Sequence, residues 1–222
     1  MEVELKYNIE SKEQMEEIWN DDFLRTIEVP DSRQEIFMKA AYFDTDELLL
    51  SGNDIAFRIR FEGSRVVGAL KWRESDTAIN GLYIRNEINV PVDDEACFIA
   101  PRPEIFKESQ EGRDLLDLLG DAPLHCMFET RFKRRKFRVE LGPAICEVAL
   151  DAGEILADGG TAPINELEIE LYSGKQEDLM KVGQKIADKY GLKPEPLSKY
   201  ARGLEIVRRD SLVGHQLEFE LK

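Results

Sequence analysis

The first seven residues, MEVELKY (1–7), alternate between apolar and charged side chains at every position. Because successive side chains of a β-strand point to opposite faces, two glutamates and Lys6 share one face while Val3, Leu5 and Tyr7 share the other. A strand with one face in water shows the same alternation. The stretch therefore predicts a strand, and its neighbours must decide where the charges point.

The same alternation recurs in five other segments. They are IAFRIRF (55–61), ALKWR (69–73), LYIRNEINV (82–90), CEVALD (146–151) and NELEIEL (165–171). Their charged faces are poor in Ser, Thr, Asn and Gln, and the signs are grouped. Basic residues gather on 55–61 and 69–73, whereas glutamates gather on the first and last of the six strands.

The whole chain predicts an α+β fold built on eight strands. Alternation places these strands at 2–9, 36–43, 55–62, 65–74, 82–92, 127–140, 144–151 and 165–172. Most links are too short for helical crossovers, so the sheet should be antiparallel, as a barrel or a sandwich. Helices are expected near 12–24, near 175–190 and after Ser198. Residues 93–126, broken by prolines and rich in leucine, read as a small helical insertion in a single domain, 1–222.

Composition limits the function classes. The chain has 222 residues, 42% hydrophobic and 34% charged, with a formal net charge of −15, so its outer field should repel nucleic acid and anionic membranes. No apolar run approaches the roughly 20 residues that a bilayer needs, and the charged start does not resemble a secretory signal, which favours a cytoplasmic protein. Three cysteines and two histidines argue against a disulfide scaffold, a zinc finger and histidine-based catalysis.

Closing the sheet into a barrel would make the first and last strands neighbours. Glu2 and Glu4 would then lie near Glu166 and Glu168, and carboxylates so crowded need a cation. An oxygen-only ligand set favours a hard cation such as Mg²⁺ or Mn²⁺, and the arginines and lysines opposite suit a polyphosphate. Since an unpaired buried ion costs several kcal/mol, such a barrel must enclose water, metal and ligand, with its apolar face outward.

Taken together, the motifs resemble the CYTH superfamily, or triphosphate tunnel metalloenzymes. The resemblance spans residues 1–205 and rests on Glu2-x-Glu4-x-Lys6, Tyr42-Phe43-Asp44-Thr45, Arg58-x-Arg60, Lys71, Arg85-x-Glu87, Glu147-Val148-Ala149-Leu150-Asp151, Glu166-x-Glu168-x-Glu170 and Ser198-Lys199-x-x-Arg202-Gly203. The insertion and the SKYARG segment look most like the bacterial inorganic triphosphatase branch, whose better-known members carry a carboxy-terminal CHAD domain. None follows here, so the chain is either a stand-alone CYTH protein or part of a longer one.

The resemblance implies an eight-stranded tunnel open at both ends and assigns roles position by position. The implied metal ligands are Glu2, Glu4, Asp151, Glu166, Glu168 and Glu170. The implied phosphate contacts are Lys6, Arg58, Arg60, Lys71, Arg85, Lys199 and, unless it pins the last helix instead, Arg202. Glu87 and Glu147 match inward acidic positions. The strand at 127–140 should add an inward arginine: Arg134 first, then Arg138, with Arg131 or Arg135 if Phe132 marks a bulge.

The implied reaction is divalent-metal-dependent hydrolysis of inorganic triphosphate (tripolyphosphate) to pyrophosphate and phosphate. The candidate acceptors of the water proton are Glu2, Glu4, Glu87, Asp151 and Glu168. Three alternatives stay open: a class IV adenylate cyclase acting on ATP, a thiamine triphosphatase, and a module that binds polyphosphate or nucleotide without turnover. The expected partner is a small triphosphate, not nucleic acid or a membrane, and the chain is expected to be a monomer or a homodimer.

Overall fold

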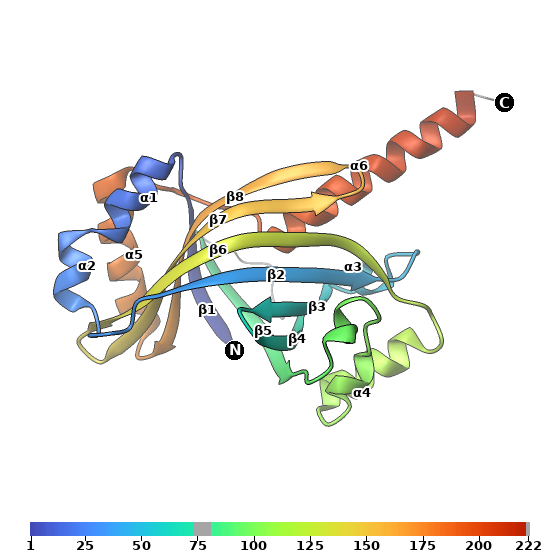
Figure 1. The fold of residues 1–222 in the computed structure, drawn as a ribbon, viewed down its shortest axis with the longest axis horizontal. Helices are drawn as coiled ribbons and strands as arrows, with labels where there is room; N and C mark the ends of the chain where they lie inside the picture. The colour runs from blue at the N-terminus through green and yellow to red at the C-terminus, as the bar shows by residue number, and fades with distance from the viewer. Residues whose placement is uncertain (73–80, 221–222) are drawn as a thin grey trace.

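The protein is a closed antiparallel barrel in a computed structural model that describes residues 1–72 and 81–220, with side chains described up to residue 209 (Figure 1). Its strands are β1 (Glu2–Asn8), β2 (Gln34–Asp44), β3 (Ile55–Glu62), β4 (Arg65–Trp72), β5 (Leu82–Pro91), β6 (His125–Leu141), β7 (Ala144–Ala157) and β8 (Gly160–Ser173). A two-residue strand, β9 (Lys193–Pro194), adds to β1.

The barrel closes because β1 pairs with both β5 and β8. Around the ring the order is β1-β5-β4-β3-β2-β6-β7-β8, and each neighbouring pair is antiparallel. Four steps separate β1 from β2 in either direction, so these two strands face each other across the interior. The predicted α+β antiparallel barrel is confirmed.

Apolar side chains on the outer face of the barrel pack under helices at two places. One core joins Leu5, Val148 and Ile169 to α1 (Lys12–Trp19), α2 (Asp22–Ile27) and α5 (Gln176–Tyr190). The other joins Phe57 and Ile59 to α3 (Leu49–Gly52), η1 (Glu95–Phe98), η2 (Pro103–Phe106) and α4 (Gln110–Leu119). The outer cores leave the inward faces of the strands to the charged residues.

A third apolar cluster lies on the inward face near one end of the barrel. Phe132, Ile155 and Ile164 are buried there together with Leu204, which comes from α6 (Lys199–Glu220). The first turns of α6 thus lie against this end of the barrel, and the helix then runs away from it (Figure 1). Within the described residues, no helix combines the length and apolarity needed to span a bilayer.

Several element boundaries differ from the sequence prediction. The helix expected at 12–24 is two helices, because Asp21 starts α2 by accepting a hydrogen bond from the Leu24 amide at 2.8 Å. Strands β7 and β8 run beyond 144–151 and 165–172 to form a long hairpin, and α3 was not predicted. Residues 73 and 74 of the strand expected at 65–74, including Arg73, lie outside the described residues.

Candidate active site

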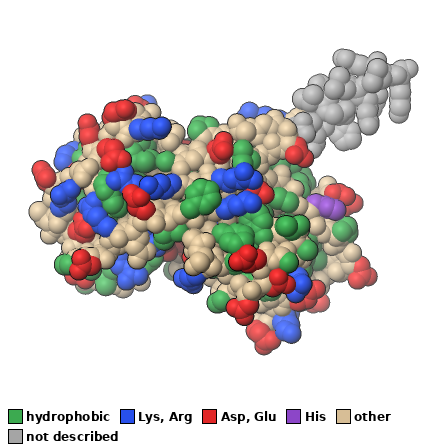
Figure 2. All heavy atoms as spheres, viewed as in Figure 1, with side chains coloured by type: hydrophobic (Ala, Val, Ile, Leu, Met, Phe, Trp, Pro, Cys, Tyr) green, Lys and Arg blue, Asp and Glu red, His purple; other side chains and the backbone are tan. Residues whose placement is uncertain are grey.

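A cavity of about 380 Å³ occupies the barrel interior. Ten basic and seven acidic side chains line it. They are Lys6, Arg58, Arg60, Arg65, Lys71, Arg85, Arg134, Lys136, Arg138 and Lys199, and Glu2, Glu4, Glu62, Glu87, Glu147, Glu168 and Glu170. The net charge of the chain is −15, so the excess of positive charge is local to the interior. On the face shown in Figure 2, by contrast, acidic and basic side chains are interspersed.

Along β6, every second side chain from Thr130 to Arg138 points toward the cavity. Phe132 lines the cavity with Arg134, and no register shift interrupts the pairing of β6 with β7. Arg131 and Arg135 point away from the cavity: Arg131 donates to Glu129, and the Arg135 guanidinium lies 4.2 Å from the Trp19 ring. The bulge considered from sequence is therefore absent at Phe132, and the inward arginines are Arg134 and Arg138.

Three of the predicted site residues do not line the cavity. Asp151 and Glu166 are fully buried in the barrel wall, and Arg202 bonds to Glu166 and donates to the Pro163 carbonyl oxygen at 3.0 Å. Arg202 thus ties α6 to β8, which is the pinning role weighed against substrate contact. The remaining predicted residues come together around the cavity as the alternation indicated.

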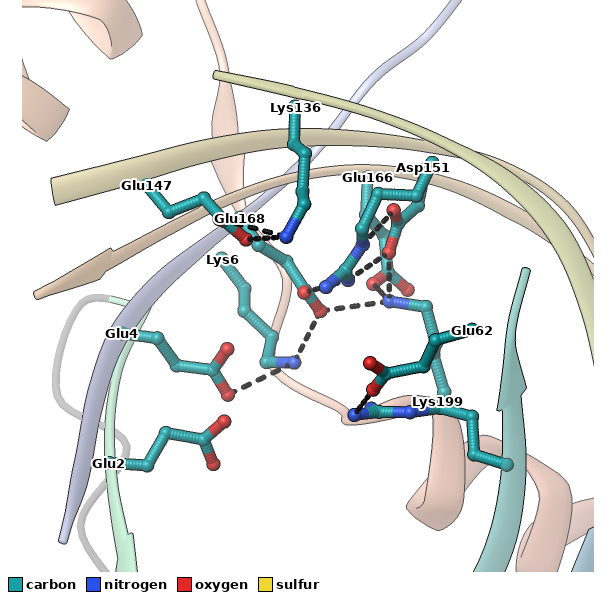
Figure 3. Close-up of polar contacts among 12 residues, drawn as sticks. Glu2, Glu4, Lys6, Glu62, Lys136, Glu147, Asp151, Glu166, Glu168 and Lys199 are labelled. Atoms are coloured by element: carbon teal, nitrogen blue, oxygen red, sulfur yellow. Dashed lines mark hydrogen bonds and ion pairs between the residues drawn. The ribbon is translucent and has the colours of Figure 1, made fainter. Parts of the chain in front are cut away.

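Asp151, Glu166 and Glu168 form one carboxylate group, here called the paired carboxylates. One oxygen from each lies within 4.8 Å of the others. The Lys199 ammonium sits among them, at 2.9 Å from Asp151, 2.5 Å from Glu166 and 2.8 Å from Glu168. Arg134 donates two hydrogen bonds to Asp151, at 2.7 and 2.6 Å, and one to Glu168 at 2.5 Å. Figure 3 shows Lys199 reaching this group from α6.

The bases neutralise the paired carboxylates. Burial alone would raise the pKa of Glu168, but Lys199, Lys6 and Arg134 outweigh burial and hold that pKa well below its usual range. The carboxylates in turn raise the pKa of Lys199 and of Arg134 despite the burial of both bases. Four cations, with Arg202 the fourth, thus surround three anions, and a metal would have to displace at least one of them.

Glu2, Glu4 and Glu170 form a second group, here called the open carboxylates. Glu4 and Glu170 are directly opposed in the β1–β8 pairing, whereas Glu168 faces Lys6 and Glu166 faces Asn8. The alternation predicts Glu2 and Glu4 near Glu166 and Glu168. The register refines this prediction: the direct partner of Glu4 is Glu170, and Glu168 lies opposite Lys6, two residues further along β1.

Fewer cations reach the open carboxylates. Lys71 donates to Glu2 at 2.7 and 3.0 Å, and Lys6 lies 3.1 Å from Glu4. In the described part of the chain, no hydrogen bond or ion pair reaches the carboxylate of Glu170. In Figure 3, Glu2 and Glu4 lie side by side and point into the interior.

The pKa values of the open carboxylates reflect this shortage of cations. Burial raises the pKa of Glu4, and the charges of Glu2 and Glu168 raise it further. Burial, followed by repulsion from Glu2 and Glu4, raises the pKa of Glu170 to about 7. Of the three open carboxylates, only Glu2 has a lowered pKa, about 2, because the effect of Lys71 outweighs that of burial. A set of oxygen donors with excess negative charge suits a hard divalent cation, so these residues could hold one.

The wall of the cavity formed by β3 is basic. Arg58 donates to the Tyr42 hydroxyl oxygen at 3.2 Å and to Glu87 at 3.3 Å, while Arg60 bonds to Glu62. Burial, and then the nearby charge of Arg58, lower the pKa of Arg60. Such a wall can bind a polyanion.

At another part of the cavity rim, Arg138 lies over the Tyr172 ring, 5.2 Å from its centroid. Tyr172 donates to Glu147 at 3.0 Å, and Lys136 donates to the same carboxylate at 3.0 Å. The sequence pattern that points Arg134 and Arg138 inward also points Lys136 inward, and it lines the cavity. Sequence reasoning missed Arg65 and Tyr172 as lining residues. Extending the alternation of Lys71 and Glu170 along their strands would have found both.

The sequence and the fold are both similar to those of known proteins. The CYTH domain matches residues 1–204. The inorganic triphosphatase of Haemophilus influenzae is 31% identical over 151 residues, which cover 66% of this chain and 39% of the relative. The chain thus matches well under half the length of that curated relative.

Solved structures show the same fold. An adenylyl cyclase candidate from Hippeastrum, described as having a dominant triphosphatase activity, superimposes with a TM-score of 0.67 at 21% identity, covering 92% of this chain and 96% of that one. A protein from Pyrococcus horikoshii OT3 gives a TM-score of 0.54 at 23% identity, covering 92% and 99%.

Proposed function

Because this chain belongs to the CYTH domain family, we propose that it is a divalent-metal-dependent phosphoanhydride hydrolase that cleaves inorganic triphosphate to pyrophosphate and phosphate. One observation carries the proposal: an enclosed cavity with ten basic and seven acidic side chains inside a protein of net charge −15. Small triphosphates carry the charge and the size that such a cavity selects.

The proposed metal ligands are the open carboxylates together with Glu168. The Lys6 ammonium forms ion pairs with both Glu4 and Glu168, so Glu168 lies close to the open carboxylates. A bound Mg²⁺ or Mn²⁺ would neutralise phosphate oxygens and lower the pKa of a coordinated water. Asp151 and Glu166, also considered as ligands from sequence, are fully buried and already bonded to Lys199, which supports a structural role for both.

The proposed substrate contacts are the basic residues on the cavity wall: Lys6, Arg58, Arg60, Lys71, Arg85, Arg134, Arg138 and Lys199. Their positions are set by the barrel before substrate binds, so most of their contribution is electrostatic stabilisation of the charge that develops on the phosphates. Among the candidate acceptors of the water proton, Asp151 is disfavoured, because it is fully buried and does not line the cavity. Glu2, Glu4, Glu87 and Glu168 line the cavity and stay candidates.

A second candidate function is supported by one specific observation. A cavity of about 270 Å³ adjoins the first and shares Ala56, Lys71, Arg85, Ser198 and Tyr200 with it. Trp72, Leu197 and Leu204 contribute apolar surface there. Such a cavity could hold the organic part of ATP or thiamine triphosphate, as a class IV adenylate cyclase or a thiamine triphosphatase would require.

A substrate panel separates these functions. We expect tripolyphosphate with Mg²⁺ or Mn²⁺ to give pyrophosphate and phosphate, with ATP and thiamine triphosphate hydrolysed more slowly and no turnover in EDTA. Phosphate, pyrophosphate and cyclic AMP are measured in each reaction. Cyclic AMP as the main product would contradict the proposal. Tight binding of tripolyphosphate without turnover would instead favour a non-catalytic phosphate-binding module.

The proposal extends to organisation. We propose that residues 1–222 form one CYTH-like domain, in which η1, η2 and α4 make up the helical insertion at 93–126. A cytoplasmic location and a monomeric or homodimeric state stay predictions.

A further inference from the structure

The inward face of β2 differs from those of its neighbours. Its side chains toward the cavity are Ile36, Met38, Ala40 and Tyr42, and none of them is charged at neutral pH. The adjacent strand β3 presents Arg58 and Arg60, and β1, directly across the barrel, presents Glu2 and Glu4. A stripe without charge therefore faces the open carboxylates.

Ala40 is the smallest residue of this stripe, and two polar side chains flank it. Arg60 on β3 and Thr130 on β6 are both its direct partners in the two strand pairings. Neighbouring strands lie about 4.8 Å apart, so Arg60 and Thr130 stand on either side of the Ala40 methyl group, roughly 10 Å apart at their backbones. Ala40, Arg60 and Thr130 all line the cavity.

Three buried polar atoms around this space have no hydrogen-bond partner among the described residues. They are Nε of Arg58, Nε of Arg60 and Oγ1 of Thr130. Thr130 is only 1% exposed and lines the cavity. Buried donors without partners are rare, because each costs the free energy of its lost hydration. Three of them, on the two strands that flank β2 and in residues that line the cavity, point to a ligand that accepts their hydrogen bonds.

We propose that these three donors and the methyl group of Ala40 form a seat for one phosphoryl group of the substrate, with Thr130 as a substrate-binding residue. The inference rests on the proposed function and deepens it. A terminal phosphoryl group has three non-bridging oxygens, one for each donor, and its negative charge complements the guanidinium groups of Arg58 and Arg60. Placed over Ala40 on β2, the group would lie across the interior from the open carboxylates on β1.

Substitutions at Thr130 test the seat. Thr130→Val keeps the shape of the side chain and removes the hydroxyl, whereas Thr130→Ser keeps the hydroxyl. Titration calorimetry with tripolyphosphate in EDTA, and KM with Mg²⁺, are measured for each. We expect Thr130→Val to raise Kd and KM about 10-fold, as for loss of one hydrogen bond to a charged group. Thr130→Ser should stay within about 2-fold of the wild type.

Ala40→Leu gives an independent test because it fills the seat and leaves every donor in place. We expect at least as large a loss of tripolyphosphate affinity, with the inner apolar cluster otherwise intact. Met38→Leu is the matched control: it changes a neighbouring lining side chain with little change in volume, and we expect affinity within about 2-fold of the wild type. Unchanged affinity in both Ala40→Leu and Thr130→Val would overturn the seat.

Thermal unfolding without ligand separates binding from a structural role. An unpartnered hydroxyl contributes nothing to stability, so Thr130→Val should not lower Tm. A marked fall in Tm with unchanged affinity would show that Thr130 is structural and would refute the inference. If the wild type neither binds nor hydrolyses tripolyphosphate, the proposed function fails. If the wild type binds it and Thr130→Val binds it equally well, only the seat fails.

Discussion

The two carboxylate groups of the barrel share a sheet face but differ in their partners. The paired carboxylates (Asp151, Glu166 and Glu168) are surrounded by four bases, one of them Lys199 from α6. The open carboxylates (Glu2, Glu4 and Glu170) have only Lys71 and Lys6 within reach in the described part of the chain. The difference teaches that proximity of carboxylates does not by itself make a metal site. A shortage of basic side chains around the carboxylates is the better indication of a metal site.

Among the variants that test this comparison, the removal of Lys199 should have the largest effect, which is a loss of stability. Lys199→Met leaves three buried carboxylates with less positive charge, and breaking a buried ion pair from one side costs about 3–5 kcal/mol. We expect the free energy of unfolding in urea to fall by about that amount. Lys107→Met, on the exposed surface, should leave it unchanged.

The same variant tests whether the two groups really differ in kind. If Mg²⁺ or Mn²⁺ restored the stability of Lys199→Met in full, the paired carboxylates would themselves be a metal site. The distinction drawn from their partners would then be wrong.

Neutralising Glu4 should have the next largest effect, on activity and not on stability. Glu4→Gln removes a charge from the proposed metal site, so we expect kcat/KM for tripolyphosphate with Mg²⁺ to fall at least about 100-fold, or about 2.7 kcal/mol. Because burial raises the pKa of Glu4, the metal-free variant should unfold at the same temperature or higher. The control is Glu154→Gln, an exposed glutamate on β7. Full activity in Glu4→Gln would remove Glu4 from the site.

Glu170 gives the smallest and most specific effect, on pH dependence. Its pKa of about 7 lies above the ordinary value of 4.5, so protonation favours the folded state. Its contribution to stability is complete below about pH 4.5 and is lost as the pH rises through 7. In EDTA, Glu170→Gln should therefore melt a few degrees above the wild type at pH 8 and close to it at pH 5.

Metal should reverse the effect of Glu170. Adding Mn²⁺ at pH 8 should raise the Tm of the wild type more than that of Glu170→Gln, since only the wild type keeps all three open carboxylates. Glu140→Gln, exposed near the end of β6, is the matched control in both media. A Tm difference between Glu170→Gln and the wild type that did not vary with pH would show that the pKa of Glu170 is not raised.

The sequence predicted the strands and the direction of their side chains well, because alternation is a local property of each strand. The register between β1 and β8 could not be predicted in this way. Sliding one strand by two residues keeps every glutamate inward, so Glu4 opposite Glu168 and Glu4 opposite Glu170 fit the alternation equally. Register depends on packing across the whole barrel, and it decides which carboxylates are paired.

Uncharged inward residues were the second gap. Only charged residues were assigned to the site from the sequence. Ala40 on β2 and Thr130 on β6 were therefore given no role, although both point toward the cavity. The division of the first helix at Asp21 was also missed, since the apolar spacing of Met15, Ile18 and Trp19 continues smoothly up to the break. A capping aspartate is visible in sequence, but its side-chain hydrogen bond to Leu24 is visible only in three dimensions.

The pairing of β1 with β8 bears on how the protein is made. The strand β1 leaves the ribosome long before its partner β8 (Gly160–Ser173), which is translated more than 150 residues later, and Lys199 follows later still. Until then the edge of β1 that pairs with β8 is open, and the buried acids lack Lys199. Closure is therefore a late event of high contact order, and nascent chains should depend on chaperones to keep the first strand from pairing elsewhere.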